Sequence, residues 1–251
     1  MQHRTIPKTA VTANETPGII AMSGVEFTWP GPRGFSLKVG RFDLAARERV
    51  LLAGPSGSGK STFLSLLTGI VVPSAGRLEV LGTDLATLSN AARDRFRAEH
   101  IGIIFQMFNL LPYGSVTDNV LLPLSFATKR RARTLDKGTP DAEARRLLTS
   151  LGLDASDVDG LAASNLSVGQ QQRVAAARAL IGRPELIIAD EPTSALDRDR
   201  QQAFLDLLFA EVEAAGTTLI MVSHDEALGQ RFDRVLRLND IAVTDRPRRQ
   251  P

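Results

Sequence analysis

The chain has 251 residues, of which 43% are hydrophobic and 23% charged, as is typical of a globular protein with one sizeable domain. Its 30 basic and 28 acidic residues leave a formal net charge of +2, so the charge balance gives no case for nucleic acid as a partner. The chain has no cysteine, which excludes disulfides, thiolate catalysis and cysteine-ligated metal sites.

The hydrophobic pattern predicts a protein outside the bilayer. No apolar run approaches the roughly 20 residues that span a membrane, and the polar N-terminus has no apolar segment of the signal-peptide type. We therefore expect a cytoplasmic protein that lies on the inner face of the cell membrane only by docking on another protein. Residues 1–18 and 245–251 contain prolines and show no hydrophobic period, so we expect flexible tails around a single domain, 19–244.

The first predicted elements are two strands, Val25–Trp29 and Ser36–Leu44, whose alternating pattern and neighbouring Gly and Pro turns indicate an antiparallel β layer. A short apolar run, Val50–Leu52, follows, and helical patterns such as Ser61–Leu67 come after it. Because this run is aliphatic and does not alternate, it is typical of a strand that is covered on both faces.

Three more apolar runs of this kind come later in the chain, at Ile101–Phe105, Leu186–Ala189 and Thr218–Val222. Helical patterns, including Gln170–Leu180, separate them. Strands that alternate with helices predict an α/β fold with a mainly parallel sheet.

The middle of the chain shows no convincing strand. Asp141–Leu151 has an amphipathic helical pattern, and we expect a helical subdomain at about 107–174, inserted into a core formed by 19–106 and 175–244. The basic stretch Lys129–Arg133 has two interpretations, a solvated loop or a contact with acidic lipid or a partner protein.

A glycine-rich loop between the strand Val50–Leu52 and the following helix fits the pattern GxxxxGK[ST]. Its glycines let backbone N–H groups approach phosphate, and the helix N-terminus adds partial positive charge. Lys60 would place a cation near the β- and γ-phosphates, and Ser61 would offer a hydroxyl to Mg²⁺. The predicted nucleotide-binding residues of this loop are Gly54, Pro55, Ser56, Gly57, Ser58, Gly59, Lys60, Ser61 and Thr62.

The strand Leu186–Ala189 leads directly into two acids, Asp190 and Glu191. An aspartate at the carboxyl end of a strand can hold Mg²⁺, so Asp190 is a candidate metal residue. Because neighbouring strand residues face opposite sides, we expect Glu191 to point elsewhere, where it can deprotonate an attacking water.

A third motif, Leu166–Arg173, opens the helical pattern that runs to Leu180. Ser167 and Gln170 fit a capping box, S-x-x-Q, at the helix start. A helix N-terminus with free N–H groups and a hydroxyl forms a second candidate anion site.

Together these motifs resemble the nucleotide-binding subunit of ATP-binding-cassette (ABC) transporters, over about residues 20–243. The loop with Ser167, Gly169 and Gln170 resembles that family's signature, usually LSGGQ. Gln106 resembles its Q-loop glutamine, which touches Mg²⁺ and senses the nucleotide. The resemblance implies a P-loop NTPase (RecA-like) core, ATP and Mg²⁺ as ligands, and ATP hydrolysis.

Three further positions are similar to functional positions of this family. Ser194–Asp197 is similar to the family's D-loop, which adds Asp197 to the expected nucleotide-binding residues. His224 is similar to the switch histidine that reaches the γ-phosphate, and with Lys60, Gln106 and Glu191 it completes the expected catalytic set. Trp29 stands where the family places an aromatic side chain that stacks on adenine, although it could instead be a core aromatic.

One residue departs from the family pattern. Val168 replaces the first glycine of the usual signature, and valine resists a positive φ. Either this position keeps a negative φ or the loop is strained.

The resemblance also implies partners. Two copies would meet head to tail, with ATP on the P-loop of one copy capped by the signature loop of the other. A transmembrane permease would dock near Met107–Val120, although the apolar residues 108–112 could equally be local core. The segment is most similar to subunits of the lipoprotein-release and macrolide-export type.

Three alternatives remain open. A DNA-repair or chromosome ATPase shares the signature, but it inserts long coiled coils between the Q-loop and the signature, and this segment is short and lacks heptads. A small-molecule kinase shares only the P-loop. A regulator could bind ATP without turnover, and an assay of hydrolysis separates it from an ATPase.

Overall fold

The structure is a computed structural model that describes residues 18–31, 34–55, 57–136 and 138–245. The two predicted tails therefore lie outside the described residues, except for Gly18 and Asp245, and Asp245 is the last residue of a strand. None of the helices within the described ranges has both the length and the apolar character that a membrane crossing requires.

The first sheet is antiparallel and has the strand order β10-β2-β1-β4-β5. Its strands are β1 Ile20–Thr28, β2 Ser36–Leu44, β4 Ala75–Val80, β5 Thr83–Asp84 and β10 Ala242–Asp245. β1 and β2 pair from Ile20 opposite Leu44 to Thr28 opposite Ser36, which confirms the antiparallel layer. β1 begins earlier than expected and ends before Trp29.

The second sheet is parallel and has the strand order β6-β7-β8-β3-β9. Its strands are β3 Arg49–Ala53, β6 Ile101–Ile104, β7 Leu186–Asp190, β8 Thr218–Ser223 and β9 Arg234–Arg237. The four predicted strands are confirmed within one or two residues at each end. The sequence pattern missed β9, because an edge strand of four residues that begins and ends with arginine carries too little apolar signal.

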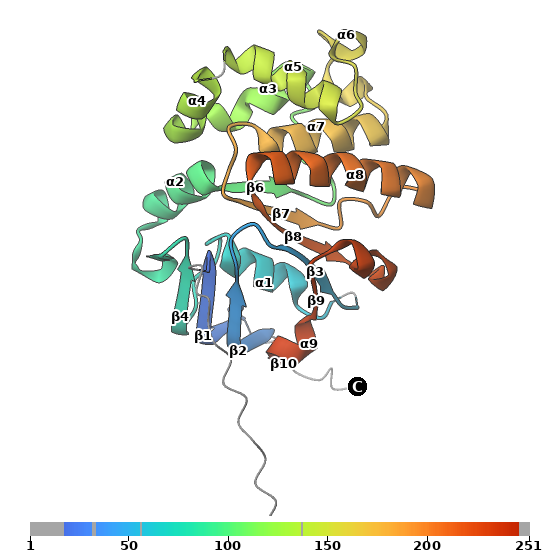
Figure 1. Cartoon of the computed structure of the whole chain (residues 1–251). Helices are drawn as coiled ribbons and strands as arrows, with labels where there is room; N and C mark the ends of the chain where they lie inside the picture. The colour runs from blue at the N-terminus through green and yellow to red at the C-terminus, as the bar shows by residue number, and fades with distance from the viewer. Residues whose placement is uncertain (1–17, 32–33, 56, 137, 246–251) are drawn as a thin grey trace, which may run out of the picture.

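Both faces of the parallel sheet are covered. In β3, Val50 and Leu52 pack in one apolar cluster with the helix α1, Lys60–Leu67, and with the antiparallel sheet. Leu51 points the other way, into a cluster with α7, Val168–Leu180, and α8, Arg198–Ala215. This alternation explains why these strands read as continuous apolar runs. Figure 1 shows α1 between the two sheets, with α7 and α8 beyond the parallel sheet.

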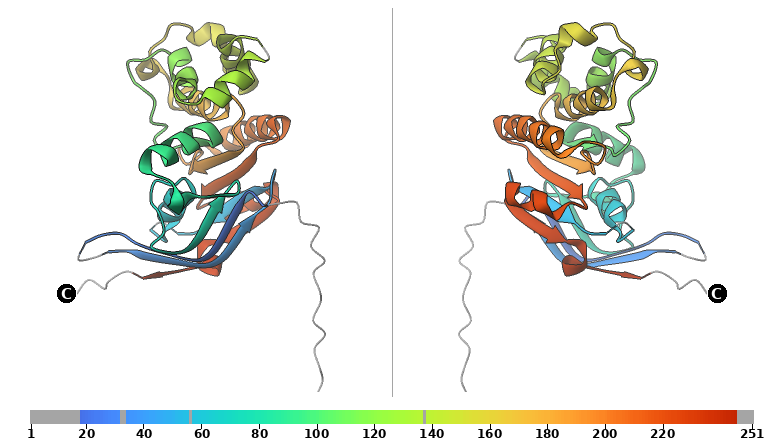
Figure 2. Two further views of the ribbon diagram at one scale, coloured as in Figure 1. Left: turned by 90° about the vertical axis from the view of Figure 1, so that its left-hand side faces the viewer. Right: turned by 90° about the vertical axis from the view of Figure 1, so that its right-hand side faces the viewer.

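A helical part lies on the far side of α7 and α8 from the antiparallel sheet, as both views in Figure 2 show. Its helices are α3 Val116–Leu121, α4 Thr128–Leu135, α5 Pro140–Ser150 and α6 Ala155–Val158. The other helices are α2 Asn90–His100 and α9 Leu238–Ile241, and the short 3₁₀ segments are Leu85–Thr87, Leu122–Ser125, Ala163–Asn165 and Glu226–Arg231. The expected boundary at 174/175 falls inside the continuous helix α7.

The basic stretch Lys129–Arg133 is not the solvated loop that one interpretation expected, because it lies on α4. The side chain of Arg130 is 1% exposed. Its guanidinium donates to the carbonyl of Ala179 at 3.0 Å and to that of Ile181, at the end of α7, and also to Ala98 at the end of α2. The carbonyl ends of two helices therefore neutralise this buried cation.

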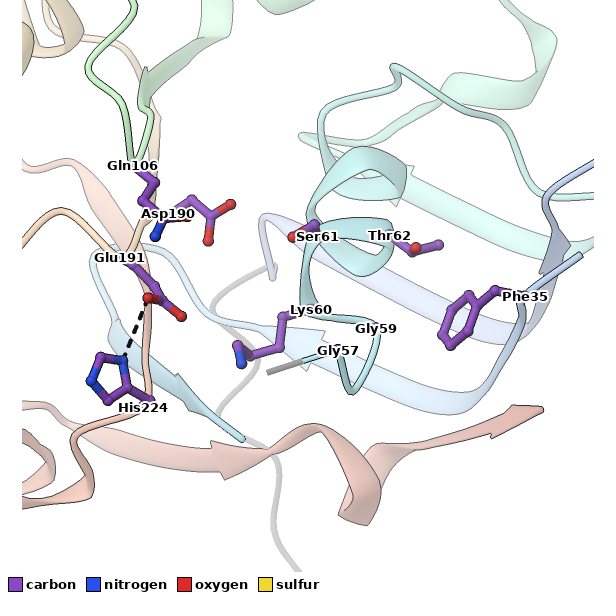
Figure 3. A pocket seen from close by; sticks show the side chains of 10 residues that line it. All are labelled: Phe35, Gly57, Gly59, Lys60, Ser61, Thr62, Gln106, Asp190, Glu191 and His224. Atoms are coloured by element: carbon purple, nitrogen blue, oxygen red, sulfur yellow. Dashed lines mark ion pairs between the residues drawn. The ribbon is translucent and has the colours of Figure 1, made fainter. Parts of the chain in front are cut away.

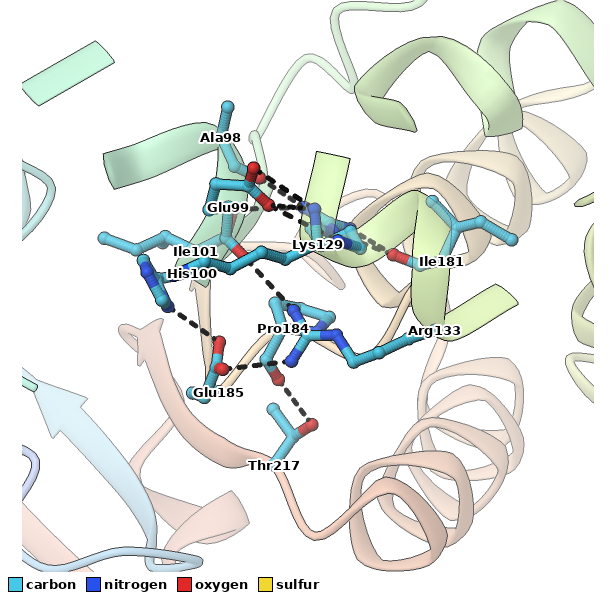
Figure 4. Close-up of polar contacts among 11 residues, drawn as sticks. Ala98, Glu99, His100, Ile101, Lys129, Arg133, Ile181, Pro184, Glu185 and Thr217 are labelled. Carbon is cyan, nitrogen blue, oxygen red and sulfur yellow. Dashed lines mark hydrogen bonds and ion pairs between the residues drawn. The ribbon is translucent and has the colours of Figure 1, made fainter. Parts of the chain in front are cut away.

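A second polar contact joins His100, Arg133 and Glu185 (Figure 4). Arg133 and His100 contact opposite oxygens of Glu185, at 3.0 and 3.1 Å. Burial raises the pKa of Glu185, but the bonds from His100 and Arg133 outweigh it and lower this pKa to about 2. Two of the basic side chains therefore hold the helical part against the core and do not face solvent as a patch.

Candidate functional site

The glycine-rich loop that fits GxxxxGK[ST] connects β3 to α1, as the sequence predicts. Gly59, which precedes α1, has φ of 106°, and a Cβ at this position would lie 2.6 Å from the Phe35 ring. Only glycine fits this combination of left-handed backbone and close approach. Ser56 lies outside the described residues.

Lys60 is the first residue of α1, and its side chain is almost fully buried. Its ammonium donates to the carbonyl oxygens of Gly54, at 2.6 Å, and of Pro55, at 2.9 Å. The hydroxyl of Ser58 is buried and has no hydrogen-bond partner in the part of the chain that is described. A buried cation and an unpaired hydroxyl beside a helix N-terminus form a site that suits an anion.

The loop opens into a cavity of about 380 Å³. The described residues that line it are Phe35, Gly57, Gly59, Lys60, Ser61, Thr62, Gln106, Asp190, Glu191 and His224 (Figure 3). Most of them follow the carboxyl ends of β3, β6, β7 and β8, which are neighbours in the parallel sheet. Ligands bind at this edge of α/β sheets, and the fold brings together residues that are more than 160 positions apart in the chain.

Asp190 ends β7, and Glu191 follows it. Burial raises the pKa of Asp190, the charge of Glu191 adds to this effect, and the charge of Lys60 opposes it. Glu191 has φ of 46°, and its N–H donates to the carbonyl of Val222 at 3.1 Å. A left-handed backbone beyond the strand, and not the alternation that we expected, therefore sets the direction of the Glu191 side chain.

The Glu191 carboxylate lies beside His224, with 3.4 Å between Oε2 and Nδ1 (Figure 3). His224 follows β8 by one residue, and its side chain is 63% exposed. Gln106, two residues after β6, reaches the same cavity from the other side of Asp190. The arrangement places a carboxylate, an imidazole and an amide within one polar cavity that also contains a buried ammonium.

Two aromatic side chains lie near the loop. The indole nitrogen of Trp29 donates to the hydroxyl of Thr62 at 3.0 Å, and the ring packs edge-on against Phe27. Trp29 does not line the cavity, although its partner Thr62 does. Phe35 lines the cavity opposite Glu191, and the sequence analysis missed it. Its carbonyl accepts the N–H of Trp29 at 3.0 Å, and the available sequence signal was its position directly after Gly34 in a segment with Gly and Pro residues.

Ser167 is the N-cap residue of α7. The Ser167 N–H donates to Gln170 Oε1 at 2.9 Å, and the Gln170 N–H donates to Ser167 Oγ at 3.4 Å, which forms the predicted capping box. Val168 is the first helical residue and has no positive φ, so the loop is not strained there. Asp197 caps α8 in a similar way, by accepting the N–H of Arg200.

Of the predicted loop residues, Gly54, Pro55 and Ser58 do not line the cavity itself. Four other predicted site residues lie away from the loop, at the starts of α7 and α8. The lining that the structure describes does not include Ser167, Gly169, Gln170 or Asp197. Their helix N-termini are exposed, and the hydrogen bonds of Ser167 to Gln170 lie within its own turn. Within one chain the candidate site therefore joins the loop, Gln106, the two acids and His224, but leaves out the Ser167 loop.

Comparison with known proteins identifies the family. The family model described as "ABC transporter" matches residues 37–194. The chain is 42% identical over 200 residues to the lipoprotein-releasing system ATP-binding protein LolD 2 of Rhodospirillum rubrum, which covers 79% of this chain and 83% of that protein. It is 39% identical over 203 residues to the macrolide export ATP-binding/permease protein MacB of Rhodopirellula baltica, which covers 81% of this chain and 29% of that longer protein.

A solved structure has the same fold. The dimeric, post-hydrolysis structure of the ATP-binding cassette MJ0796, bound to ADP and Pi, matches with a TM-score of 0.72 and 30% identity over 91% of this chain and 99% of that one. The chain therefore belongs to the ABC transporter family, as an ATP-binding subunit with the cassette fold of the ABC-type ATPases.

Proposed function

We propose that the cavity binds ATP with Mg²⁺ and that each ATP is enclosed between the loop of one copy and the Ser167 loop of a second copy. The observation that carries the proposal is the split between the two halves of the site. The loop, the acids and His224 line one cavity, whereas the capped N-terminus of α7 is exposed and is not part of the lining that the structure describes.

The phosphates would lie on the loop at the N-terminus of α1. Lys60 would exchange its bonds to the carbonyls of Gly54 and Pro55 for phosphate oxygens, and the unpaired Ser58 hydroxyl would gain a partner. Trp29 lies beside the loop through its bond to Thr62, which suits an aromatic surface for the base. Stacking of a base on such a ring contributes about 1–3 kcal/mol, so Trp29 supports binding without being essential for it.

The oxygens of Ser61, Gln106 and Asp190 line the same cavity and suit Mg²⁺, a hard cation that prefers oxygen ligands. Burial and the charge of Glu191 raise the pKa of Asp190 and so favour its neutral form. A nearby cation would oppose this effect and favour the ionised carboxylate. When bound, Mg²⁺ would neutralise charge on the β- and γ-phosphates.

Hydrolysis needs a base near the γ-phosphate. We assign this role to Glu191, whose carboxylate would accept the proton of the attacking water. His224, 3.4 Å away, would hold the carboxylate in place and contact the γ-phosphate. Lys60 would stabilise the charge that develops on the phosphate oxygens in the transition state.

The second copy would complete the site. The N–H groups and hydroxyl of its Ser167 loop, with Gly169 and Gln170, would face the γ-phosphate, and its Asp197 would lie near the shared interface. ATP would hold the two copies together. Hydrolysis would break the bond between the β- and γ-phosphates, and release of the phosphate would remove the bridging charge so that the copies separate. The MJ0796 neighbour was solved as a dimer, which supports this proposal for the present chain.

The recipient of this motion is proposed to be a transmembrane permease at the inner face of the cell membrane. Met107, which directly follows Gln106, and Tyr113 are 80% and 82% exposed and would contact it. Phe108 is buried in the core cluster, so the apolar run 108–112 divides between core and surface. The names of the LolD and MacB relatives support lipoprotein release or macrolide export as the function of the complex.

The structure weighs against one alternative. The described residues between Gln106 and Ser167 form short helices, of which the longest has 11 residues, and not the coiled coil of a DNA-repair ATPase. An assay of ATP hydrolysis distinguishes a regulator that binds ATP without turnover from an ATPase.

The proposal is tested by measuring phosphate release from ATP by the purified chain, with and without Mg²⁺. We expect Mg²⁺-dependent release that rises more steeply than linearly with protein concentration, because two copies form each site. Lys60→Ala should lose ATP binding. ATP binding without any release would support the regulator, and the absence of ATP binding by the folded wild-type chain would refute the proposal.

A further inference from the structure

The backbone directly after Gln106 is held in an unusual conformation. Phe108 and Asn109 are consecutive residues with φ of 59° and 49°. Left-handed backbone is uncommon for residues other than glycine, and it is rarest for a bulky side chain such as Phe108, although Asn tolerates it better. Two such residues in a row persist only when their surroundings hold them.

Arg178 provides much of that hold. This residue lies on α7, and its side chain is 8% exposed. One guanidinium nitrogen donates to the carbonyl of Asn109 at 2.7 Å, and the other donates to the carbonyl of Phe108. A buried cation therefore bonds to both residues of the left-handed pair, and the Phe108 side chain packs in the same apolar cluster as α7.

The contact joins two parts of the proposed site that are otherwise separate. Gln106 lines the cavity with Lys60 and Asp190, only two residues before the left-handed pair. Arg178 lies about three turns along α7 from Ser167, which caps the same continuous helix. A path of direct bonds thus leads from the cavity of one copy to the loop that it offers to the second copy.

We propose that Arg178 is a positioning residue that ties the backbone after Gln106 to α7 and so holds Gln106 and the Ser167 loop in a fixed relation to each other. The left-handed pair is the part of the backbone that these bonds hold. With Arg178 bonded it stays left-handed, and without those bonds it relaxes toward the backbone regions that Phe and Asn prefer. This inference rests on the proposed two-copy site.

The first test is Arg178→Met, which keeps the volume of the side chain and removes its donors. Without these bonds, the backbone after Gln106 is no longer tied to α7, and so Gln106 and the Ser167 loop are no longer held in a fixed relative position. We expect the hydrolysis rate at saturating ATP to fall about tenfold or more, while the KM and the dissociation constant for ATP stay within about threefold. Arg178→Lys, which retains the charge and some donors, should be intermediate.

The second test separates this role from general support of the fold, and it uses Asn109. In the Arg178→Met background, Asn109→Gly makes the left-handed conformation accessible without the arginine, whereas Asn109→Ala does not. The Asn109 carbonyl is present in both variants. We expect the glycine variant to recover at least about threefold of the lost rate and the alanine control to recover none.

The two tests have clear contrary outcomes. Equal rates in the Gly and Ala variants, or an unchanged maximal rate in Arg178→Met, would overturn the inference. If Arg178→Met does not fold, the same comparison is made in Arg178→Lys. A wild-type chain that shows no hydrolysis would instead refute the proposed function, so the two failures are distinguishable.

Discussion

Replacing Glu191 by Gln tests the chemistry of the cavity with the smallest change in shape. The amide occupies the same space but cannot accept a proton from water. A positioned general base contributes about 10²–10⁴-fold to a rate, so we expect hydrolysis to slow by about that factor, or about 2.7–5.5 kcal/mol in the activation free energy. The contact with His224, at 3.4 Å, is too long to account for so large an effect by itself.

ATP binding should be retained in Glu191→Gln, because the loop and Lys60 are untouched and a negative charge near the phosphates is removed. The charge of Glu191 also raises the pKa of Asp190, so its loss favours the ionised form of that residue. The assay measures phosphate release at saturating Mg²⁺ and ATP, together with ATP affinity by equilibrium dialysis. Hydrolysis within about tenfold of wild type would refute the assignment of Glu191 as the base.

Three further predictions concern residues around the site. Val168→Gly should change the hydrolysis rate by less than about tenfold, because Val168 already has a helical backbone and Gly costs only about 1 kcal/mol in a helix. Asp190→Asn should abolish Mg²⁺-dependent hydrolysis yet raise the melting temperature of the nucleotide-free chain, because the raised pKa of Asp190 indicates that its ionised form is costly in the folded state. The melting temperature of the wild-type chain, measured by calorimetry, should fall as pH rises through this raised pKa. Asp190→Asn should not show this pH dependence. Glu185→Gln should reduce the free energy of unfolding by about 1 kcal/mol at neutral pH after allowing for solvent screening, and denaturant titrations should show the difference vanishing as pH falls from the ordinary carboxyl range toward 2, because the pKa of Glu185 is lowered to about 2.

The sequence was most informative where a local pattern carries the physics. The β3–α1 loop needs glycine for its backbone and lysine for its charge, so Gly59 and Lys60 could be assigned from spacing alone. The buried strands were equally clear, because coverage on both faces removes the alternation from runs such as Val50–Leu52. The capping box of Ser167 and Gln170 is also a purely local feature, and its geometry followed from its spacing.

What could not be predicted depends on contacts between distant parts of the chain. Because Arg130 is charged, the sequence predicts a surface residue. It is buried, however, and its guanidinium donates hydrogen bonds to carbonyl oxygens at the ends of two helices. Nothing in the letters of Phe108 and Asn109 indicates left-handed backbone, because Arg178 supplies the compensating bonds from α7. The direction of Glu191 was expected from strand alternation, but the strand ends one residue earlier.

The most direct test of the two-copy site is to mix two inactive chains. Glu191→Gln leaves a chain with an intact Ser167 loop, and Ser167→Phe leaves a chain with an intact cavity. Each alone should hydrolyse ATP at least about 100-fold more slowly than wild type. In an equimolar mixture that pairs at random, half of the dimers contain both chains and one of their two sites is complete, so about a quarter of the wild-type rate should return. No recovery in the mixture, with both variants folded and binding ATP, would contradict the claim that a second copy completes the site.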